Sequence, residues 1–292
     1  MKILSFGEVL WDVFPDYKTL GGAPFNFAAH ASIQGAEAYM LSAVGEDELG
    51  KTTVKEIEKY NINTNFVSIV PDKETGKCLV TLDENKIPSY NLLNDVAYDY
   101  IKKPEIVENT FDIFAFGTLA LRSKNNFETV KQLISEKISH EIYSDLNIRA
   151  PFYNKESVML CLKNATIVKI SDEELPVINE TVFGLNSDTE ASAVKLSEKF
   201  PQIKIIIVTK GEKGSLAYDC ANKKYFYANA APAEIVSTVG AGDSFGAAFL
   251  TTYYKQKDLQ KALDTASKLS AYVVSKKDAV SLEMTDFINS LR

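Results

Sequence analysis

The sequence predicts an α/β protein in which helices cover both faces of a mostly parallel β-sheet. Short apolar, β-rich runs alternate with helical patterns over most of the 292 residues, and hydrophobic residues make up 46% of the chain, enough for a large core. One region is different, because strand-like pieces around residues 66–98 follow one another without a helix between them. No repeat or linker interrupts the chain, so we expect a single domain over residues 1–292.

The first half of the chain sets the alternation. Lys2–Phe6 is a short apolar run typical of a buried strand, and Phe25–Gln34 is expected to be a helix that begins near Pro24. Tyr39–Val44 is the next expected strand, and Asp47–Tyr60 has the charged, amphipathic pattern of a surface helix.

The same alternation continues towards the C-terminus. Four further strands and three helices are expected: Phe111–Phe116, Ile142–Leu146, Thr166–Ile170 and Ile203–Val208, separated by Ser123–Ser139, Asn154–Lys163 and Asp188–Lys199. Ser215–Asp219 and Lys224–Ala228 favour an antiparallel pair, and the chain is mainly helical from Asp243 onward. Ligands of such sheets bind at the carboxyl ends of the strands.

The exceptional region consists of Phe66–Val70, Lys77–Leu82 and Pro88–Leu93, joined by short turns. Consecutive strands without a crossover helix predict an antiparallel β insert. It is either an extension of the sheet edge or a lid, formed by about residues 12–22 and 66–98, that closes over a substrate. An open sheet edge also seeks a partner, so a homodimer through this lid is expected.

Composition excludes several classes of function. There are 32 Lys and Arg residues against 39 Asp and Glu, a net charge of -7, which gives no general attraction for nucleic acid or an anionic membrane. Three scattered cysteines and two histidines favour neither a disulfide framework nor a zinc site. Neither a signal peptide nor an apolar run of membrane-spanning length is visible, so a cytoplasmic location is expected.

The glycine-rich segment Gly240-Ala241-Gly242-Asp243 is the strongest functional signal. Glycines leave backbone N–H groups accessible, and the start of the following apolar helix adds partial positive charge, so the segment suits phosphate oxygens. A carboxylate there would repel phosphate unless it acts as the base in phosphoryl transfer. The alternative is an ordinary helix start with a favourable Asp. The spacing fits neither the dinucleotide fingerprint of an NAD-dependent oxidoreductase nor a P-loop.

A second glycine segment near the N-terminus identifies a family. Gly-Gly-x-x-x-Asn-x-Ala at residues 21–28, Thr-x-Gly-Ala-Gly-Asp-x-Phe at residues 238–245 and the stretch Ala43–Gly50 resemble the ribokinase-like, PfkB-type carbohydrate kinases over nearly the whole chain. Within that family the chain is most similar to bacterial fructokinases, and the similar segments are Phe6–Asp12, Phe116–Ser123, Asp145–Tyr153 and Ala271–Ser275.

The resemblance implies roles for the sugar side of the site. Asp243 would be the catalytic base, and the backbone N–H groups of Gly240, Ala241 and Gly242 would form the anion hole. The residues implied to hold the sugar are Asp12, Gly22, Asn26 and Arg149. Carboxylate and amide groups suit sugar hydroxyls, and a guanidinium can bind phosphate through two hydrogen bonds. A water-facing acid at a strand end is the alternative for Asp12, and a surface ion pair is the alternative for Arg149.

The resemblance also implies a nucleotide side. Its residues are Asn147, Lys169, Thr209, Gly211, Gly214 and Thr238. The turn from Thr209 to Gly214 follows an expected strand, and its glycines would let the backbone approach the ribose and phosphates. An ordinary hairpin turn explains the same residues from sequence alone.

Two positions depart from the family pattern and bear on the ions. Similar fructokinases have Asn-x-x-Glu where this chain has Ser171-Asp172-Glu173-Glu174. Glu174 is retained as the magnesium-side residue, although Ser-x-x-Glu is also a helix capping box. Ser237 stands where the family has an Asp that is tied to a monovalent cation site, so activation by K⁺ is not expected.

The resemblance therefore implies an ATP-dependent sugar kinase with Mg²⁺ as its metal, and most closely a fructokinase that makes fructose 6-phosphate. The same chemistry on ribose, a ketogluconate, a nucleoside or a sugar phosphate remains open. A non-catalytic sugar or nucleotide sensor on the same fold is a further alternative, although the expected base and loop glycines are present. The expected partners are a small-molecule sugar and ATP.

Overall fold

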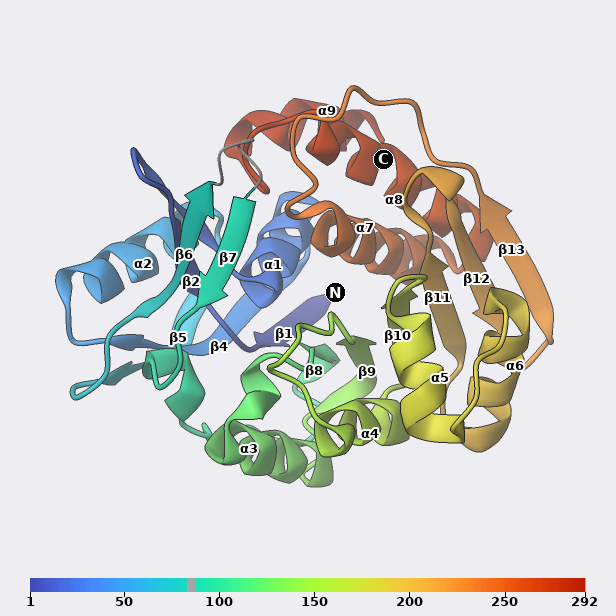
Figure 1. Ribbon diagram of the computed structural model, residues 1–292, viewed down its shortest axis with the longest axis horizontal. Helices are drawn as coiled ribbons and strands as arrows, with labels where there is room; N and C mark the ends of the chain where they lie inside the picture. The colour runs from blue at the N-terminus through green and yellow to red at the C-terminus, as the bar shows by residue number, and fades with distance from the viewer. Residues whose placement is uncertain (83–87, 292) are drawn as a thin grey trace.

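The structure is a computed structural model that describes residues 1–82 and 88–291 (Figure 1). Its main sheet has the order β13-β12-β11-β10-β9-β8-β1-β4-β5. The pairs from β5 across to β11 are parallel, and β12 pairs antiparallel with both of its neighbours. The strands are β1 (Lys2–Phe6), β4 (Glu37–Gly45), β5 (Asn63–Val70), β8 (Phe111–Phe116), β9 (Ser139–Asp145), β10 (Ile167–Ser171), β11 (Ile205–Thr209), β12 (Ser215–Asp219) and β13 (Lys224–Ala228).

Helices cover both faces of this sheet (Figure 1). One face carries α3 (Lys124–Ser135), α4 (Lys155–Asn164), α5 (Leu175–Phe183) and α6 (Thr189–Lys199), and the other carries α1 (Ala23–Ile33), α2 (Glu48–Lys59), α7 (Ala241–Gln256), α8 (Leu259–Val274) and α9 (Thr285–Ser290). Successive strand residues point to opposite faces, so Leu4 and Phe6 join the first core while Ile3 joins the second. The predicted fold class is confirmed.

Two elements differ from the sequence prediction. Phe66–Val70 was assigned to the antiparallel insert, and this is wrong, because β5 pairs parallel with β4 at the edge of the main sheet. The physical reason is that α2 supplies the crossover between β4 and β5, which makes β4-α2-β5 an ordinary βαβ unit. Helix α5, which follows β10, was not predicted.

A second, smaller sheet of order β3-β2-β6-β7 stands beside the main one (Figure 1). It is built from β2 (Leu10–Val13), β3 (Lys18–Gly21), β6 (Gly76–Leu82) and β7 (Pro88–Leu92). The outer pairs are antiparallel, as predicted for the insert, while β2 and β6 run parallel. Residues 83–87 of the predicted lid lie outside the described part of the chain. That this sheet moves as a lid stays a prediction.

Asp47 fixes the small sheet to the main one. Its carboxylate accepts hydrogen bonds from the N–H of Gly50 at 2.6 Å, which caps α2, and from the N–H and Oγ1 of Thr75 at 2.9 and 2.6 Å. Thr75 Oγ1 in turn accepts the N–H of Gly45 at 3.0 Å. The Ala43–Gly50 segment therefore anchors the chain between β5 and β6.

The chain order of the strands places a crevice at the carboxyl end of β1. In the main sheet, β1 lies between β4 and β8. Along the chain, the next strand of this sheet is β4 on one side of β1, and the chain returns later to β8 on the other side. Such a switch point leaves room between the loops that leave neighbouring strands. Among the described residues, no helix combines the length and apolar character needed to cross a membrane.

Candidate active site

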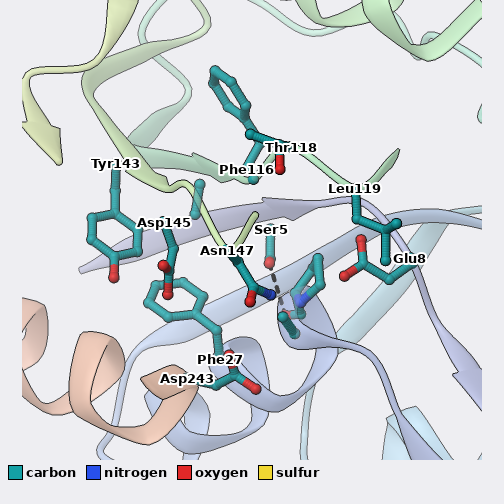
Figure 2. Close-up of a pocket in the computed structure, with 14 residues that line it drawn as sticks. Ser5, Glu8, Phe27, Phe116, Thr118, Leu119, Tyr143, Asp145, Asn147 and Asp243 are labelled. Atoms are coloured by element: carbon teal, nitrogen blue, oxygen red, sulfur yellow. Dashed lines mark hydrogen bonds between the residues drawn. The ribbon is translucent and has the colours of Figure 1, made fainter. Parts of the chain in front are cut away.

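A cavity of about 30 Å³ lies at this switch point (Figure 2). Its walls come from the carboxyl ends of β1, β8 and β9 and from the first turns of α1 and α7. Polar side chains meet apolar ones in it: Glu8, Asp145, Asn147 and Asp243 lie with Phe27 and Leu119. The structure thus brings Asp243 and Asn147 together in one cavity.

The first turn of α7 has the geometry of an anion site. Gly240 precedes the helix with φ of 79°, and a Cβ atom there would lie 2.6 Å from Cβ of Ala279. At Gly242 a Cβ atom would lie 3.1 Å from Nζ of Lys169, so a side chain would push against that ammonium group. Within the described chain, the N–H groups of Gly240 and Gly242 have no backbone acceptor, whereas Ala241 donates to Thr238 O at 3.3 Å.

Asp243, on α7, is held by a hydrogen bond from a residue of α1. Asn26, in the first turns of α1, donates from Nδ2 to Oδ2 of Asp243 at 2.8 Å. Burial raises the pKa of Asp243 to about 6, and the charge of Asp145 adds to this rise, while Asn26, Lys169 and Arg149 oppose it. A carboxylate with a pKa just below neutrality is suited to accept a proton from a hydroxyl group as the reaction proceeds.

Lys169 and Asp145 form a buried ion pair beside this base. The register between β9 and β10 sets the two residues side by side, and Nζ of Lys169 lies 2.7 Å from Oδ2 of Asp145. The other carboxylate oxygen, Oδ1 of Asp145, is buried without a hydrogen-bond partner in the described structure. Asp145, Glu174 and Asp243 together raise the pKa of Lys169.

Glu174 bridges two loops with its carboxylate. One oxygen accepts the N–H of Ser171 at 2.7 Å and the other accepts the N–H of Ile148, while the N–H of Glu174 donates to Ser171 Oγ at 3.3 Å. The reciprocal hydrogen bonds of a capping box are therefore present, but in the turn before α5: the N-cap residue of α5 is Glu174, whose side chain does not cap it. Burial and the neighbouring Asp145 raise the pKa of Glu174.

The other predicted sugar-side residues, Gly22, Asp12 and Arg149, are not among the described residues that line the cavity. Gly22 begins α1 with φ of 106°, and a Cβ atom there would lie 2.5 Å from the carbonyl oxygen of Glu8. Asp12 lies on β2 of the small sheet, where burial raises its pKa to about 6. Arg149 is exposed, and its positive charge lowers the pKa values of Glu8 and Asp243.

Of the predicted nucleotide-side residues, Asn147 lines the cavity, whereas Thr209, Gly211, Gly214 and Thr238 are not among its described lining residues. Thr209 ends β11 in register with Ser171 of β10. Gly211 and Gly214 follow with φ of 54° and 89°, and a Cβ atom at Gly214 would collide with the carbonyl oxygen of Ala228. Thr238 is exposed in the loop before α7. In the same loop, Ser237 Oγ accepts the N–H of Val239 at 3.3 Å.

Sequence reasoning missed three side chains of this site. Glu8, only 4% exposed, lines the cavity two residues after β1 ends. Tyr143 lines it from β9, and its hydroxyl approaches Gly246 so closely that a Cβ atom there would collide with it. Asp145 ends the same strand. Polar residues at or just after the ends of buried strands were the available signal for Glu8 and Asp145.

Comparison with known proteins agrees with this arrangement. Residues 5–285 match the family described as pfkB family carbohydrate kinase. The chain belongs to this family. The Gly240–Asp243 segment at the start of α7 and the Gly21–Asn26 segment at the start of α1 are thus parts of one pfkB kinase fold, which confirms the resemblance seen in the sequence.

Several relatives cover nearly all of this pfkB kinase. A probable fructokinase-5 of Arabidopsis thaliana is 28% identical over 95% of this chain and 93% of its own length. An ATP-dependent 6-phosphofructokinase of Thermoanaerobacterium thermosaccharolyticum is also 28% identical, over 99% of this chain and 93% of its own. The crystal structure of an uncharacterized sugar kinase of Pyrococcus horikoshii in complex with ATP has a TM-score of 0.79 at 28% identity, covering 95% of this chain and 93% of that one.

Proposed function

We propose that this carbohydrate kinase transfers the γ-phosphate of ATP to a hydroxyl group of a neutral sugar, most closely fructose, which gives fructose 6-phosphate. The observation that carries the proposal is the buried contact between Asn26 and Asp243 at the first turn of α7. It joins a base with a pKa of about 6 to accessible backbone N–H groups of a helix start. Phosphoryl transfer needs both within reach of one hydroxyl group.

The reaction then follows from the positions of these groups. Asp243 accepts the proton as the O–H bond of the sugar breaks, and the sugar oxygen forms the new bond to phosphorus while the bond to ADP breaks. The N–H groups of Gly240 and Gly242, which have no backbone acceptor in the described structure, would stabilise the negative charge that develops on the transferred phosphoryl group. Lys169, beside Gly242, adds a positive charge at this position.

The acidic side chains next to Asp243 fit a hydrated Mg²⁺. Oδ1 of Asp145 is buried without a partner, and the charges of Asp145, Glu174 and Asp243 reinforce one another. In residues 1–82 and 88–291 no group of three or more His, Cys, Asp or Glu side chains is placed to hold a metal ion. Mg²⁺ usually keeps several waters and is bound through one or two carboxylates together with substrate phosphates. Asp145 and Glu174 would hold it, and it would neutralise charge on the phosphates.

The side chains of the cavity favour a neutral sugar over a sugar phosphate. Three carboxyl groups, those of Glu8, Asp145 and Asp243, line it, and no Lys or Arg is among its described lining residues. Carboxylates accept hydrogen bonds, which sugar hydroxyls supply and a phosphate does not, and Asn26, which contacts Asp243 from outside the lining, has a further unpartnered acceptor in Oδ1. This favours the fructokinase among the relatives over the 6-phosphofructokinase.

ADP release with purified protein tests this function. A panel of hexoses, pentoses, nucleosides and sugar phosphates should show the highest kcat/KM with fructose. Replacement Asp243→Asn should lower kcat about 10³-fold, because the base is lost, while ATP binding changes little. Asp264→Asn, an exposed acid on α8, is the matched control. Near-normal kcat in Asp243→Asn, or no activity on the whole panel, would contradict the proposal.

A further inference from the structure

Glu8 is the buried acid of the site that the mechanism above does not use. It lies in the link between β1 and β2, where the chain leaves the main sheet for the small one. The chain returns from the small sheet past Glu8 at Gly22, where a Cβ atom would lie 2.5 Å from the carbonyl oxygen of Glu8. Glu8 therefore lies where the first two of the chain's connections between the sheets meet, and it is 4% exposed.

The carboxyl group of Glu8 faces the cavity. Figure 2 shows it pointing past Leu119 to the side where Asn147 lies. In the described structure its carboxyl group accepts only its own backbone N–H. Burial and the charge of Asp243 raise its pKa to about 7, against the opposing effect of Arg149 and Arg122. A buried carboxyl group with so few partners is costly to the fold unless a ligand supplies them.

The surroundings define which ligand would supply them. Oδ1 of Asn26 and Oδ1 of Asp145 are likewise buried acceptors without partners, and Phe27 and Leu119 add apolar surface. A polyol has hydroxyl donors for several acceptors at once, together with C–H faces for the apolar side chains. An anionic group at the same place would face the carboxylates of Glu8 and Asp243 without a cation among the lining residues.

We propose that Glu8 is a specificity-determining residue: its carboxyl group hydrogen-bonds one hydroxyl group of a bound neutral sugar and excludes sugars that carry an anionic group at that end. This inference rests on the proposed function and names the class of substrate for the same site. It assigns Glu8 to substrate choice, whereas Asp243 carries out proton transfer.

Kinetics with a set of singly deoxygenated fructoses test the assignment. Glu8→Gln should raise KM for fructose about 10-fold and Glu8→Leu about 100-fold, the losses expected for a weakened and a missing hydrogen bond to a charged group, with little change in kcat. For the one deoxyfructose that lacks the contacted hydroxyl, KM should be equal in wild type and Glu8→Leu. Glu8→Gln should also improve kcat/KM for fructose 1-phosphate relative to fructose. The exposed Glu48→Gln is the control.

Trp11 gives a second measurement that does not depend on turnover. It is the single tryptophan of the chain and lies on β2 beside Asp12, so its fluorescence should report the Kd of fructose without ATP. Two results would overturn this inference alone. One is that Glu8→Leu binds every deoxyfructose more weakly than wild type by the same factor. The other is that KM is unchanged in both Glu8 variants while wild type phosphorylates fructose. Wild-type protein that binds no neutral sugar would overturn the proposed function as well.

Discussion

The ion pairs Arg122–Asp99 and Lys169–Asp145 are both buried, but they differ in which of their atoms have no hydrogen-bond partner. Arg122 uses Nε and Nη2 on both oxygens of Asp99, at 2.8 and 2.9 Å, and Nη2 also reaches Leu93 O at 2.7 Å. Its guanidinium lies between the rings of Tyr98 and Phe152. Lys169 occupies only one oxygen of Asp145 and leaves the other, an acceptor, buried and unpartnered, whereas the unpartnered buried atom of the first pair is the donor Nη1 of Arg122. We infer that the first pair is a structural clamp and the second is kept ready for a ligand.

Arg122→Met should give the largest effect, and on stability alone. Loss of the guanidinium leaves Asp99 buried without its ion partner, which should lower the free energy of unfolding by about 3–5 kcal/mol. Urea unfolding measures this, and kcat/KM per folded molecule should change little. The double variant with Asp99→Leu should recover much of the loss. A large fall in kcat/KM with normal stability would show that this pair, too, serves the reaction.

Asp145→Asn should give the reverse of Arg122→Met: a large loss of activity with a small loss of stability. Lys169 keeps the charges of Glu174 and Asp243 nearby, so the variant should lose far less stability than Arg122→Met. Activity should fall about 10- to 100-fold, the range typical of lost groups around a metal or its ligands. Steady-state kinetics at several Mg²⁺ concentrations measure it. Strong destabilisation with normal kcat/KM would make the two ion pairs equivalent and refute the comparison.

Asp243 should also titrate in the working range of pH. Because Asp243 must be ionised to act as the base, kcat/KM should reach a plateau above pH 6 and fall about tenfold per pH unit below it. A profile that is flat between pH 5 and 8 would contradict its role as the base.

The raised pKa of Asp243 also makes stability depend on pH, but in the opposite direction: activity should fall as pH falls, whereas stability should fall as pH rises. Burial favours the protonated form of Asp243, so the stability this group contributes is complete below its unfolded pKa near 4 and is lost as pH rises through about 6. Asp243→Asn should therefore be more stable than wild type at pH 8, by up to about 3 kcal/mol, and equal to it at pH 4. Thermal unfolding of both proteins at the two pH values measures this. A variant less stable at pH 8 would refute it.

Exchanging the monovalent cation should have the smallest effect on kcat/KM. Ser237 brings no charge to the loop before α7, and its hydroxyl accepts the N–H of Val239. We expect the same kcat/KM in K⁺, Na⁺ and tetramethylammonium salts. Ser237→Asp restores an anionic oxygen of the kind that binds hard cations and should introduce a dependence on K⁺. Activation of the wild type by K⁺ would contradict this expectation.

The sequence predicted the parts of the site that depend on local structure. Gly240 and Gly242 stand at a helix start because only a short, glycine-containing turn fits there, so the motif and its place are visible in the chain itself. Asp243 follows at once. The same holds for Gly22 at the start of α1, where the backbone of Glu8 leaves no space for a side chain.

The parts that depend on packing between distant segments were not predictable in this way. Lys169 meets Asp145 because of the register between β9 and β10, and Glu8 faces Asp243 across 235 positions of sequence. The placement of β5 failed for a similar reason, since a strand that is followed by a turn-rich stretch looks the same whether it joins one sheet or the other. Only the three-dimensional pairing distinguishes these cases.

The bond between Asn26 and Asp243 also bears on how the protein becomes active during its synthesis. The two residues are 217 positions apart, and His30, one turn after Asn26 on α1, binds Ala279 O at 2.8 Å, still further along the chain. A nascent chain that has already folded its first strands therefore holds neither the base nor the partners of these two buried side chains. Only when α7 and the segment around Ala279 leave the ribosome can the site close, so we expect unfinished chains to hydrolyse no ATP and to leave this face of α1 open to chaperones.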